Sequence, residues 1–356
     1  MDMSRRNVLK ALSALLAAGS LPIGNRAAWA ASKSFVWGAT AAVSSPNLLE
    51  PFTKQSGIEV STQLFSDPAE VISKLKTGGA GVHLLLDGSY HSRIAYEMGI
   101  LQPIDDTKLS NLKNIFPEFS NADGLFFEGK RFGVPLNWGT DSVVIRADQV
   151  GGTIDDIGAL FDEQFAGRIG MPNGLYESLL VAGIYLGVPD PFDMSADELN
   201  AAVDLLVKQK PLVRSYWNDI GDLKNQLATG EVIIAWGWQP VMDIRKDGVD
   251  LQWIHPKQGE IAWYDASYLT VEADAETSDA CMEFIDYTLG DFYGAQLGAD
   301  TGYRTVSSEA AGKMSEELKE SLSIDNVASF LKSANWWTPP KNPNAYQEAW
   351  DKVLNS

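Results

Sequence analysis

The sequence predicts an α/β protein with two lobes, each built on a doubly wound sheet, and a ligand cleft between the lobes. Strand and helix patterns alternate from residue 33 onward, which is typical of a mainly parallel sheet. A second alternating unit starts near residue 134, and the chain crosses back near residue 261. Two lobes joined by two extended crossovers form a hinged cleft that can close around a ligand.

The first lobe is expected to contain three strands, each followed by a helix. Short apolar runs indicate the strands, and apolar residues three or four positions apart indicate the helices. In chain order, the elements are strand 33–38, helix 47–57, strand 58–65, helix 67–78, strand 82–88 and helix 91–100. Asp67 is the candidate cap of the second helix, and Pro68 suits its first turn. Ligands collect at the carboxyl ends of such strands, where Trp37 and the loop after Leu86 lie.

The second lobe is expected to combine helices and a strand with a helical C-terminal region. The expected elements are helices 177–187 and 195–210, strand 232–238, crossover 261–271, and helices 278–290, 315–322 and 344–354. We predict that the first lobe comprises residues 31–137 and 267–304. The second lobe would then comprise residues 138–266 and 305–356.

Residues 1–30 are predicted to be an export signal that is not part of the fold. The segment SRRNVLK (residues 4–10) matches a twin-arginine signal, and a short apolar stretch follows over 11–21. Ala28-Trp29-Ala30 supplies a cleavage site. The apolar stretch is too short and interrupted for a membrane span, and an ordinary surface helix is the alternative. We therefore expect a periplasmic protein cleaved near Ala30.

The net charge of the chain is strongly negative. It is −19 for the full sequence, and removal of residues 1–30 takes away four basic residues and one acidic residue, which leaves −22. Such a charge argues against nucleic acid or an anionic membrane as a partner and favours the approach of cations. Solubility alone would explain it equally well.

The enzyme and metal signatures that we considered are not met. The segment GLFFEGKR (residues 124–131) imitates a phosphate-binding loop, but arginine follows the lysine where serine or threonine is needed. His83, His91 and His255 are scattered, so no metal site is expected, and Cys281 is expected to be buried in a helix. We therefore expect no catalytic activity, no cofactor and no metal.

Tryptophan and one carboxylate are the most informative residues. Ten of the eleven tryptophans follow residue 30, and many fall at predicted strand ends. Asp265 lies among aromatic residues in GEIAWYDASY (residues 259–268), where an unpaired buried charge would be costly. Tryptophan faces attract organic cations, and a carboxylate beside them completes an ammonium site. We expect Asp265 to bind an ammonium group, with pairing to Arg304 or to a backbone amide as the alternative.

Seven segments, taken in order, resemble one known family. They are LLEPFTKQSGIEV, ISKLKTGGAGVHLLLDGSY, GILQPIDDTKLSN, FGVPLNWGTDSVVIR, LATGEVIIAWGW, GEIAWYDASYLTV and DTGYRTVS. The chain resembles, over residues 33–353, the periplasmic solute-binding proteins of the spermidine/putrescine type, which serve ATP-driven (ABC) importers. The resemblance implies the two-lobed type II periplasmic-binding fold.

The resemblance also implies a ligand site made of aromatic and acidic side chains. The matching residues are Trp37, Tyr90, Glu177, Trp236, Trp263, Asp265, Tyr303 and Trp336, with Trp337 as the alternative to Trp336. In the family, the counterpart of Asp265 binds an amino group of the ligand.

Three positions depart from the polyamine binders. Thr40 replaces a tyrosine, Gly88 replaces a serine, and Gly174 replaces the aspartate of an Asp–Glu pair that grips one amine. We expect a polyamine or another small organic amine, with a quaternary ammonium or a zwitterion such as 4-aminobutyrate as the alternative. A zwitterion would need a partner for its carboxylate, and Arg214 or Arg304 could supply one.

The resemblance implies a binding protein that captures its ligand by lobe closure. The closed form would dock on an ABC permease in the inner membrane. We expect a monomer. Two alternatives from other classes are an exported enzyme on the same cleft fold and a signalling protein that contacts a receptor.

Overall fold

The computed structural model describes residues 33–65, 68–174, 176–324 and 327–356. The predicted export signal and the candidate cap Asp67 lie outside this part of the chain. The strands are β1 (Ser34–Ala39), β2 (Glu59–Leu64), β3 (Leu84–Gly88), β4 (Phe126–Phe127), β5 (Lys130–Arg131), β6 (Gly133–Arg146), β7 (Ile169–Pro172), β8 (Val213–Trp217), β9 (Ile234–Trp238), β10 (Leu251–Trp253), β11 (Ile261–Leu269), β12 (Arg304–Thr305) and β13 (Asn335–Trp336).

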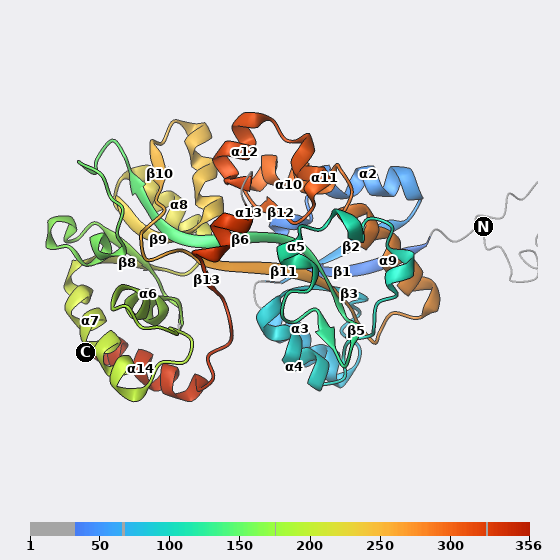
Figure 1. Cartoon of the computed structure of the whole chain (residues 1–356), viewed down its shortest axis with the longest axis horizontal. Helices are drawn as coiled ribbons and strands as arrows, with labels where there is room; N and C mark the ends of the chain where they lie inside the picture. The colour runs from blue at the N-terminus through green and yellow to red at the C-terminus, as the bar shows by residue number, and fades with distance from the viewer. Residues whose placement is uncertain (1–32, 66–67, 175, 325–326) are drawn as a thin grey trace, which may run out of the picture. The chain divides into compact units, whose positions relative to one another are not determined.

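The helices lie on both faces of the sheet (Figure 1). They are α2 (Pro46–Ser56), α3 (Pro68–Thr77), α4 (Ser92–Glu97), α5 (Pro117–Ser120), α6 (Glu177–Tyr185), α7 (Ala196–Gln209), α8 (Ile220–Thr229), α9 (Ala275–Thr288), α10 (Tyr293–Thr301), α11 (Ser308–Lys313), α12 (Glu316–Leu322), α13 (Val327–Lys332) and α14 (Pro343–Asn355). Short 3-10 helices are η1 (Ala41–Val43), η2 (Ser89–His91), η3 (Asp106–Lys108), η4 (Leu112–Asn114), η5 (Ile157–Phe161), η6 (Glu163–Phe165), η7 (Lys210–Leu212) and η8 (Gln239–Asp247). None of the described helices is long and apolar enough to cross a membrane.

The two predicted crossovers, β6 and β11, lie side by side in the middle of the sheet (Figure 1). Among the described residues, eleven strands form one sheet with the order β2-β1-β3-β11-β6-β9-β7-β8, to which β10, β12 and β13 attach. β1 pairs in parallel with β2 and β3, and β7 pairs in parallel with β8 and β9. The α/β class and the two-lobed fold are confirmed. Instead of two separate sheets, however, there is one, because β6 and β11 pair with each other as well as with strands on both sides.

The hydrophobic side chains fall into separate clusters in the two halves of the sheet. The first cluster contains Phe35 and Trp37 and continues to Val306 and Leu322. The second contains Ile169 and Leu180 together with residues of α14, and a third lies around Trp217 and Leu223. The predicted lobe limits stay a prediction, and this packing favours assigning residues 306–331 to the first lobe.

Local sequence signals specify many element ends. Helix α7 begins with a capping box in which Ser195 and Glu198 bond to each other's backbone amides. Gly57 ends α2 in the left-handed conformation, as its position predicted. The loop that imitates a phosphate site is the turn of the β4–β5 hairpin, with Glu128 and Gly129 at positive φ. Cys281 is buried in α9, as predicted.

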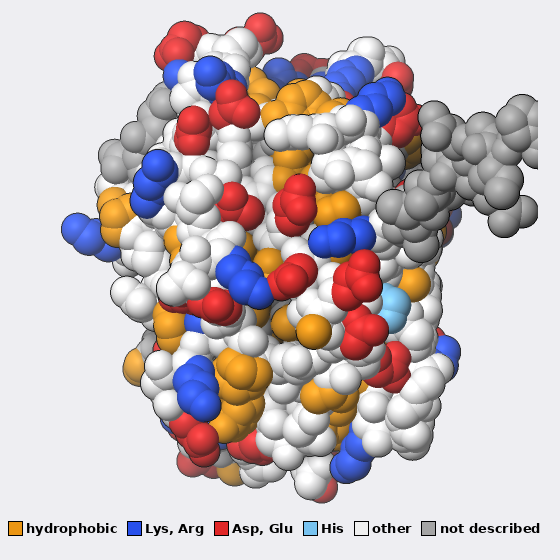
Figure 2. Space-filling view, turned by 90° about the vertical axis from the view of Figure 1, so that its right-hand side faces the viewer, with side chains coloured by type: hydrophobic (Ala, Val, Ile, Leu, Met, Phe, Trp, Pro, Cys, Tyr) orange, Lys and Arg blue, Asp and Glu red, His pale blue; other side chains and the backbone are white. Residues whose placement is uncertain are grey.

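The surface carries charges of both signs. Figure 2 shows one face of the molecule, on which acidic and basic side chains are interspersed.

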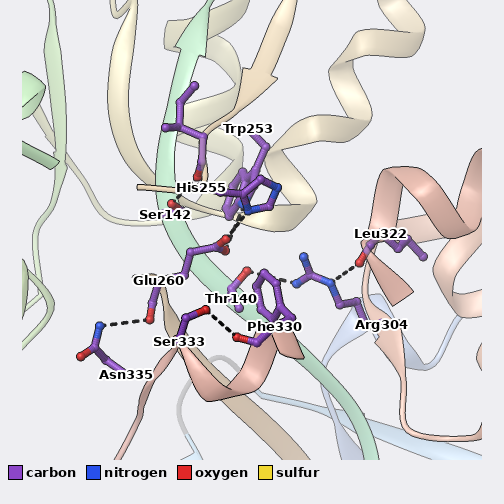
Figure 3. A network of polar contacts seen from close by, with 11 residues as sticks. Thr140, Ser142, Trp253, His255, Glu260, Arg304, Leu322, Phe330, Ser333 and Asn335 are labelled. Atoms are coloured by element: carbon purple, nitrogen blue, oxygen red, sulfur yellow. Dashed lines mark hydrogen bonds and ion pairs between the residues drawn. The ribbon is translucent and has the colours of Figure 1, made fainter. Parts of the chain in front are cut away.

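Arg304 is buried and connects β6 to the C-terminal helices (Figure 3). It is 1% exposed, its Nε donates to the Leu322 carbonyl, and its Nη1 donates to Thr140 Oγ1 at 3.1 Å. The guanidinium also lies 4.7 Å from the Trp138 ring centroid and 5.0 Å from that of Phe330. Arg304 therefore holds α12 and α13 against the central strand.

We expect Arg304→Ala to lower the free energy of unfolding by roughly 2–4 kcal/mol, because it leaves a cavity and an unpaired Leu322 carbonyl. Arg214→Ala is the matched control, since Arg214 is half exposed and pairs with Glu231 at the surface, and such pairs contribute at most about 1 kcal/mol. Urea unfolding measures both effects. Equal unfolding midpoints for the two variants would contradict the role of Arg304.

Candidate ligand-binding site

A cavity of about 240 Å³ lies at the carboxyl ends of several strands. Thr40 directly follows β1, Gly88 ends β3, and Trp238 ends β9. Strand ends of this kind are where open α/β sheets bind ligands. The lining residues are Thr40, Phe65, Leu86, Asp87, Gly88, Asp141, Glu177, Trp238, Trp263, Asp265, Tyr303 and Trp337.

The lining contains four carboxyl groups. They come from Asp87 on β3, Asp141 on β6, Glu177 at the start of α6 and Asp265 on β11. No lysine, arginine or histidine is among the described residues that line the cavity. Within the described chain, Asp141, Glu177 and Asp265 form no ion pair with a basic side chain. Asp87 pairs with His91 Nδ1 at 2.9 Å, outside the lining, whereas the other three carboxyl groups have no basic partner among the described lining residues.

Asp265 lies on β11 between β3 and β6. It is opposite Gly88 on one side and Asn137 on the other, and Asn137 Nδ2 donates to Asp265 Oδ2 at 3.0 Å. Burial raises the pKa of Asp265 to about 7, the Asn137 hydrogen bond opposes this shift, and the charge of Asp87 adds to it. The expected alternative of an Asp265–Arg304 pair is wrong, because Arg304 points to Leu322 and Thr140.

The aromatic walls stand close to the carboxylates. Trp263 and Tyr303 meet edge to face, with ring centroids 5.5 Å apart and an interplanar angle of 89°. Trp238 is fixed at 90° against buried Trp217 at 5.0 Å. Trp337 packs on Phe192 at 5.3 Å. Rings held in this way offer faces and edges to a ligand without reordering when it binds.

Four of the predicted site residues line the cavity, namely Glu177, Trp263, Asp265 and Tyr303. Tyr90 lies in η2, and its side chain is outside what the structure describes. Of the neighbouring tryptophans, Trp337 lines this cavity, whereas Trp336 lines a second cavity near α13 and packs on Phe119.

The structure places Trp37 and Trp236 in the hydrophobic cores, not in the cavity. Both are 0% exposed, and Trp37 packs edge-on against Phe284 of α9 at 4.9 Å. The physical reason is position along the strand. Helices cover the interiors of β1 and β9, so in these two strands Thr40 and Trp238, at or just beyond the carboxyl ends, reach the cavity.

Sequence reasoning did not name Phe65, Asp87, Asp141 or Trp238 as site residues, and it treated Thr40 and Gly88 only as departures from the polyamine binders. Alternation along the crossover strand places Asp141 on the same face as Asn137, but which face meets the cavity depends on the pairing register of the strand. Trp238 could have been preferred to Trp236 because it is the last residue of its strand.

Neither arginine considered for a zwitterion lines the cavity. Arg214 pairs with Glu231 on the surface of β8, and Arg304 is committed to the contacts described above. No group of three or more His, Cys, Asp or Glu side chains suited to a metal ion occurs in the described part of the chain.

Comparisons with known proteins find solute-binding proteins of bacteria. The model of a family described as bacterial extracellular solute-binding protein matches residues 47–324. The chain is 27% identical to the spermidine/putrescine-binding periplasmic protein of Salmonella typhimurium, over 95% of this chain and 97% of that protein. It is 26% identical to the putrescine-binding periplasmic protein PotF of Escherichia coli, over 86% and 88% of the two chains.

A solved structure has the same fold. It is the spermidine/putrescine ABC transporter substrate-binding protein PotD of Streptococcus pneumoniae, in complex with calcium and HEPES. The match has a TM-score of 0.79 at 22% identity and covers 91% of this chain and 98% of that one.

We expect Asp265 to make the ligand-free protein less stable as the pH rises from about 4 to 7. Its pKa is about 7 in the folded protein and about 3.9 in an unfolded chain, so in this interval the folded state binds more protons. The stabilisation from the protonated group is complete below pH ~4 and is lost as the pH approaches 7. Asp265→Asn removes this loss, and its melting temperature should exceed that of the wild type by about 2 °C or more at pH 8.

Melting temperatures of both proteins between pH 4.5 and 8.5 test this expectation. Asp204→Asn, at an exposed position on α7, is the control and should follow the wild type. A constant difference between Asp265→Asn and wild type at every pH would show that Asp265 does not titrate in this range.

Proposed function

This chain belongs to the bacterial extracellular solute-binding protein family, and on this premise we propose that it captures a small organic amine in the periplasm for an ABC importer. The relatives named above bind spermidine or putrescine and are periplasmic. Export would use the twin-arginine signal, with cleavage near Ala30, and the mature protein would act as a monomer.

The observation that carries the proposal is the group of three carboxyl groups, those of Asp141, Glu177 and Asp265, in a cavity without a basic side chain among its described lining residues. Burying such charges is costly unless an opposite charge compensates for them. An ammonium group supplies that charge and donates hydrogen bonds to carboxylates. Trp263, Trp238 and Trp337 can cover the methylene groups of an amine and attract its cationic end.

A cationic amine fits this lining better than a zwitterion does. The carboxylate of 4-aminobutyrate would enter a cavity that already holds four acidic side chains, and like charges repel strongly where water is excluded. Arg214 and Arg304 make other contacts, so neither is in place to receive it.

Capture couples ligand binding to proton release and to lobe closure. With a pKa of about 7, Asp265 is largely protonated in the ligand-free protein below neutral pH, which limits the cost of leaving it unpaired. An arriving ammonium favours the ionised form, and the proton leaves. The central strands β6 and β11 would act as the hinge, because they alone run through both halves of the described sheet. The closed form would then dock on a membrane permease.

We expect putrescine and other organic amines to raise the melting temperature of mature protein, residues 31–356. A ligand at 100 times its dissociation constant adds about 2.7 kcal/mol of stability. Asp265→Asn should abolish the increase because it removes the charge that pairs with the ammonium. A thermal-shift panel of putrescine, spermidine, agmatine, choline, glycine betaine and 4-aminobutyrate gives the measurement.

Asp204→Asn is again the control and should keep the full shift. A response to 4-aminobutyrate or glycine betaine alone would contradict the assignment of a cationic amine. A flat response to the whole panel would contradict the ligand class, although it would leave the family membership untouched.

A further inference from the structure

Asp141 occupies the opposite end of the cavity from Asp265. Along β6, Asn137, Gly139 and Asp141 alternate with core residues and therefore share one face of the strand. Asn137 is opposite Asp265, and Gly139 is opposite Trp263. Four residues of strand separate Asn137 from Asp141, which is about 13 Å between Cα atoms. The Trp263 ring lies over Gly139, between Asn137 and Asp141, and therefore separates the two aspartates.

Trp263 holds the Asp141 carboxyl group in place. Its ring lies over Gly139, where a side chain on residue 139 would collide with it, and its Nε1 donates to Asp141 Oδ1 at 2.8 Å. On the side of β6 away from β11, Asp141 is opposite Trp238 of β9. No hydrogen bond to Asp141 Oδ2 is present within the described residues, so this oxygen remains for a ligand.

Asp141 and Glu177 form a second acidic end. Asp141 is 2% exposed, and burial raises its pKa well above the ordinary value, with the Trp263 bond opposing and the charges of Glu177 and Glu260 adding to the shift. Burial also raises the pKa of Glu177. Burial raises the pKa of Tyr303, and the charges of Asp265 and Asp141 add to this shift.

Gly174 leaves room for the Glu177 carboxyl group and supplies no carboxyl group of its own. The Glu177 carboxyl group fills the space that a side chain on residue 174 would occupy. An acid at position 174 is therefore incompatible with this placement of Glu177. Asp141 supplies a second carboxyl group to the same end of the cavity from a different strand.

We propose that Asp141, together with Glu177, binds the second cationic group of a ligand that has two amino groups, and that Asp141 thereby determines specificity for diamines over monoamines. This inference rests on the proposed function, because Asp265 would receive the first amino group. The cavity then has one acidic end on β3 and β11 and another on β6 and α6, with Trp263 between them and Tyr303 edge to face against Trp263.

The test compares putrescine with 1-aminobutane, which has the same carbon chain and one amino group. Isothermal titration calorimetry should show wild type binding putrescine more tightly. Asp141→Asn should weaken putrescine binding by about 10- to 100-fold, the range for a hydrogen bond to a charged group, and leave 1-aminobutane binding nearly unchanged. Asp265→Asn should weaken both.

Binding of 1-aminobutane also reports that a variant is folded. If Asp141→Asn fails to fold, Asp141→Ser, which is smaller and uncharged, gives the same comparison. Retained preference for putrescine in a folded Asp141 variant would overturn the role of Asp141. Equal binding of the two amines by wild type would overturn the two-ended site. Failure of wild type to bind either amine would instead overturn the proposed function itself.

Discussion

Uncompensated negative charge in the interlobe cavity is the constraint on which the rest of the site depends. Asp141, Glu177 and Asp265 lie in a partly dehydrated space with no basic partner among the described lining residues, and burial raises the pKa of each. Protonation of Asp265 relieves part of this cost below neutral pH, whereas an organic cation also relieves it at neutral pH. The same charges that make the empty cavity unfavourable therefore make it selective for amines over anions and zwitterions.

The strand pair β6–β11 carries different groups on its two faces. On one face of β6, Trp138 and Thr140 receive the buried Arg304 and the C-terminal helices. On the other face, Asn137 donates a hydrogen bond to Asp265, and Asp141 lines the cavity. The Arg304 guanidinium therefore lies on the side of β6 away from the cavity, and the carboxyl groups of Asp141 and Asp265 lie on the cavity side. Because β6 and β11 also run through both halves of the described sheet, a change in their twist would change the width of the cavity.

Much of the fold could be predicted from the sequence because its local signals agree with the final structure. Apolar periodicity, the Ser195 capping box and the Gly57 helix end specify elements without reference to the rest of the chain. Family resemblance found Asp265, Trp263, Tyr303 and Glu177. It misplaced Trp37 and Trp236, since depth within a strand depends on which helices cover it. It also missed Asp141, whose place in the cavity follows from the pairing register of β6 with β11, and register is not visible in one strand alone.

The central claim is that ligand capture neutralises buried carboxyl groups, and proton release measures this most directly. Titration calorimetry of the mature protein with putrescine at pH 6.5, in buffers of different ionisation enthalpy, gives the number of protons released per ligand bound. We expect Asp265 to release between about one half and one proton per ligand at this pH, a number that declines above pH 8 as Asp265 ionises without the ligand. Binding with no proton release at pH 6.5 would contradict the claim, because the carboxyl groups would then already be ionised in the empty cavity.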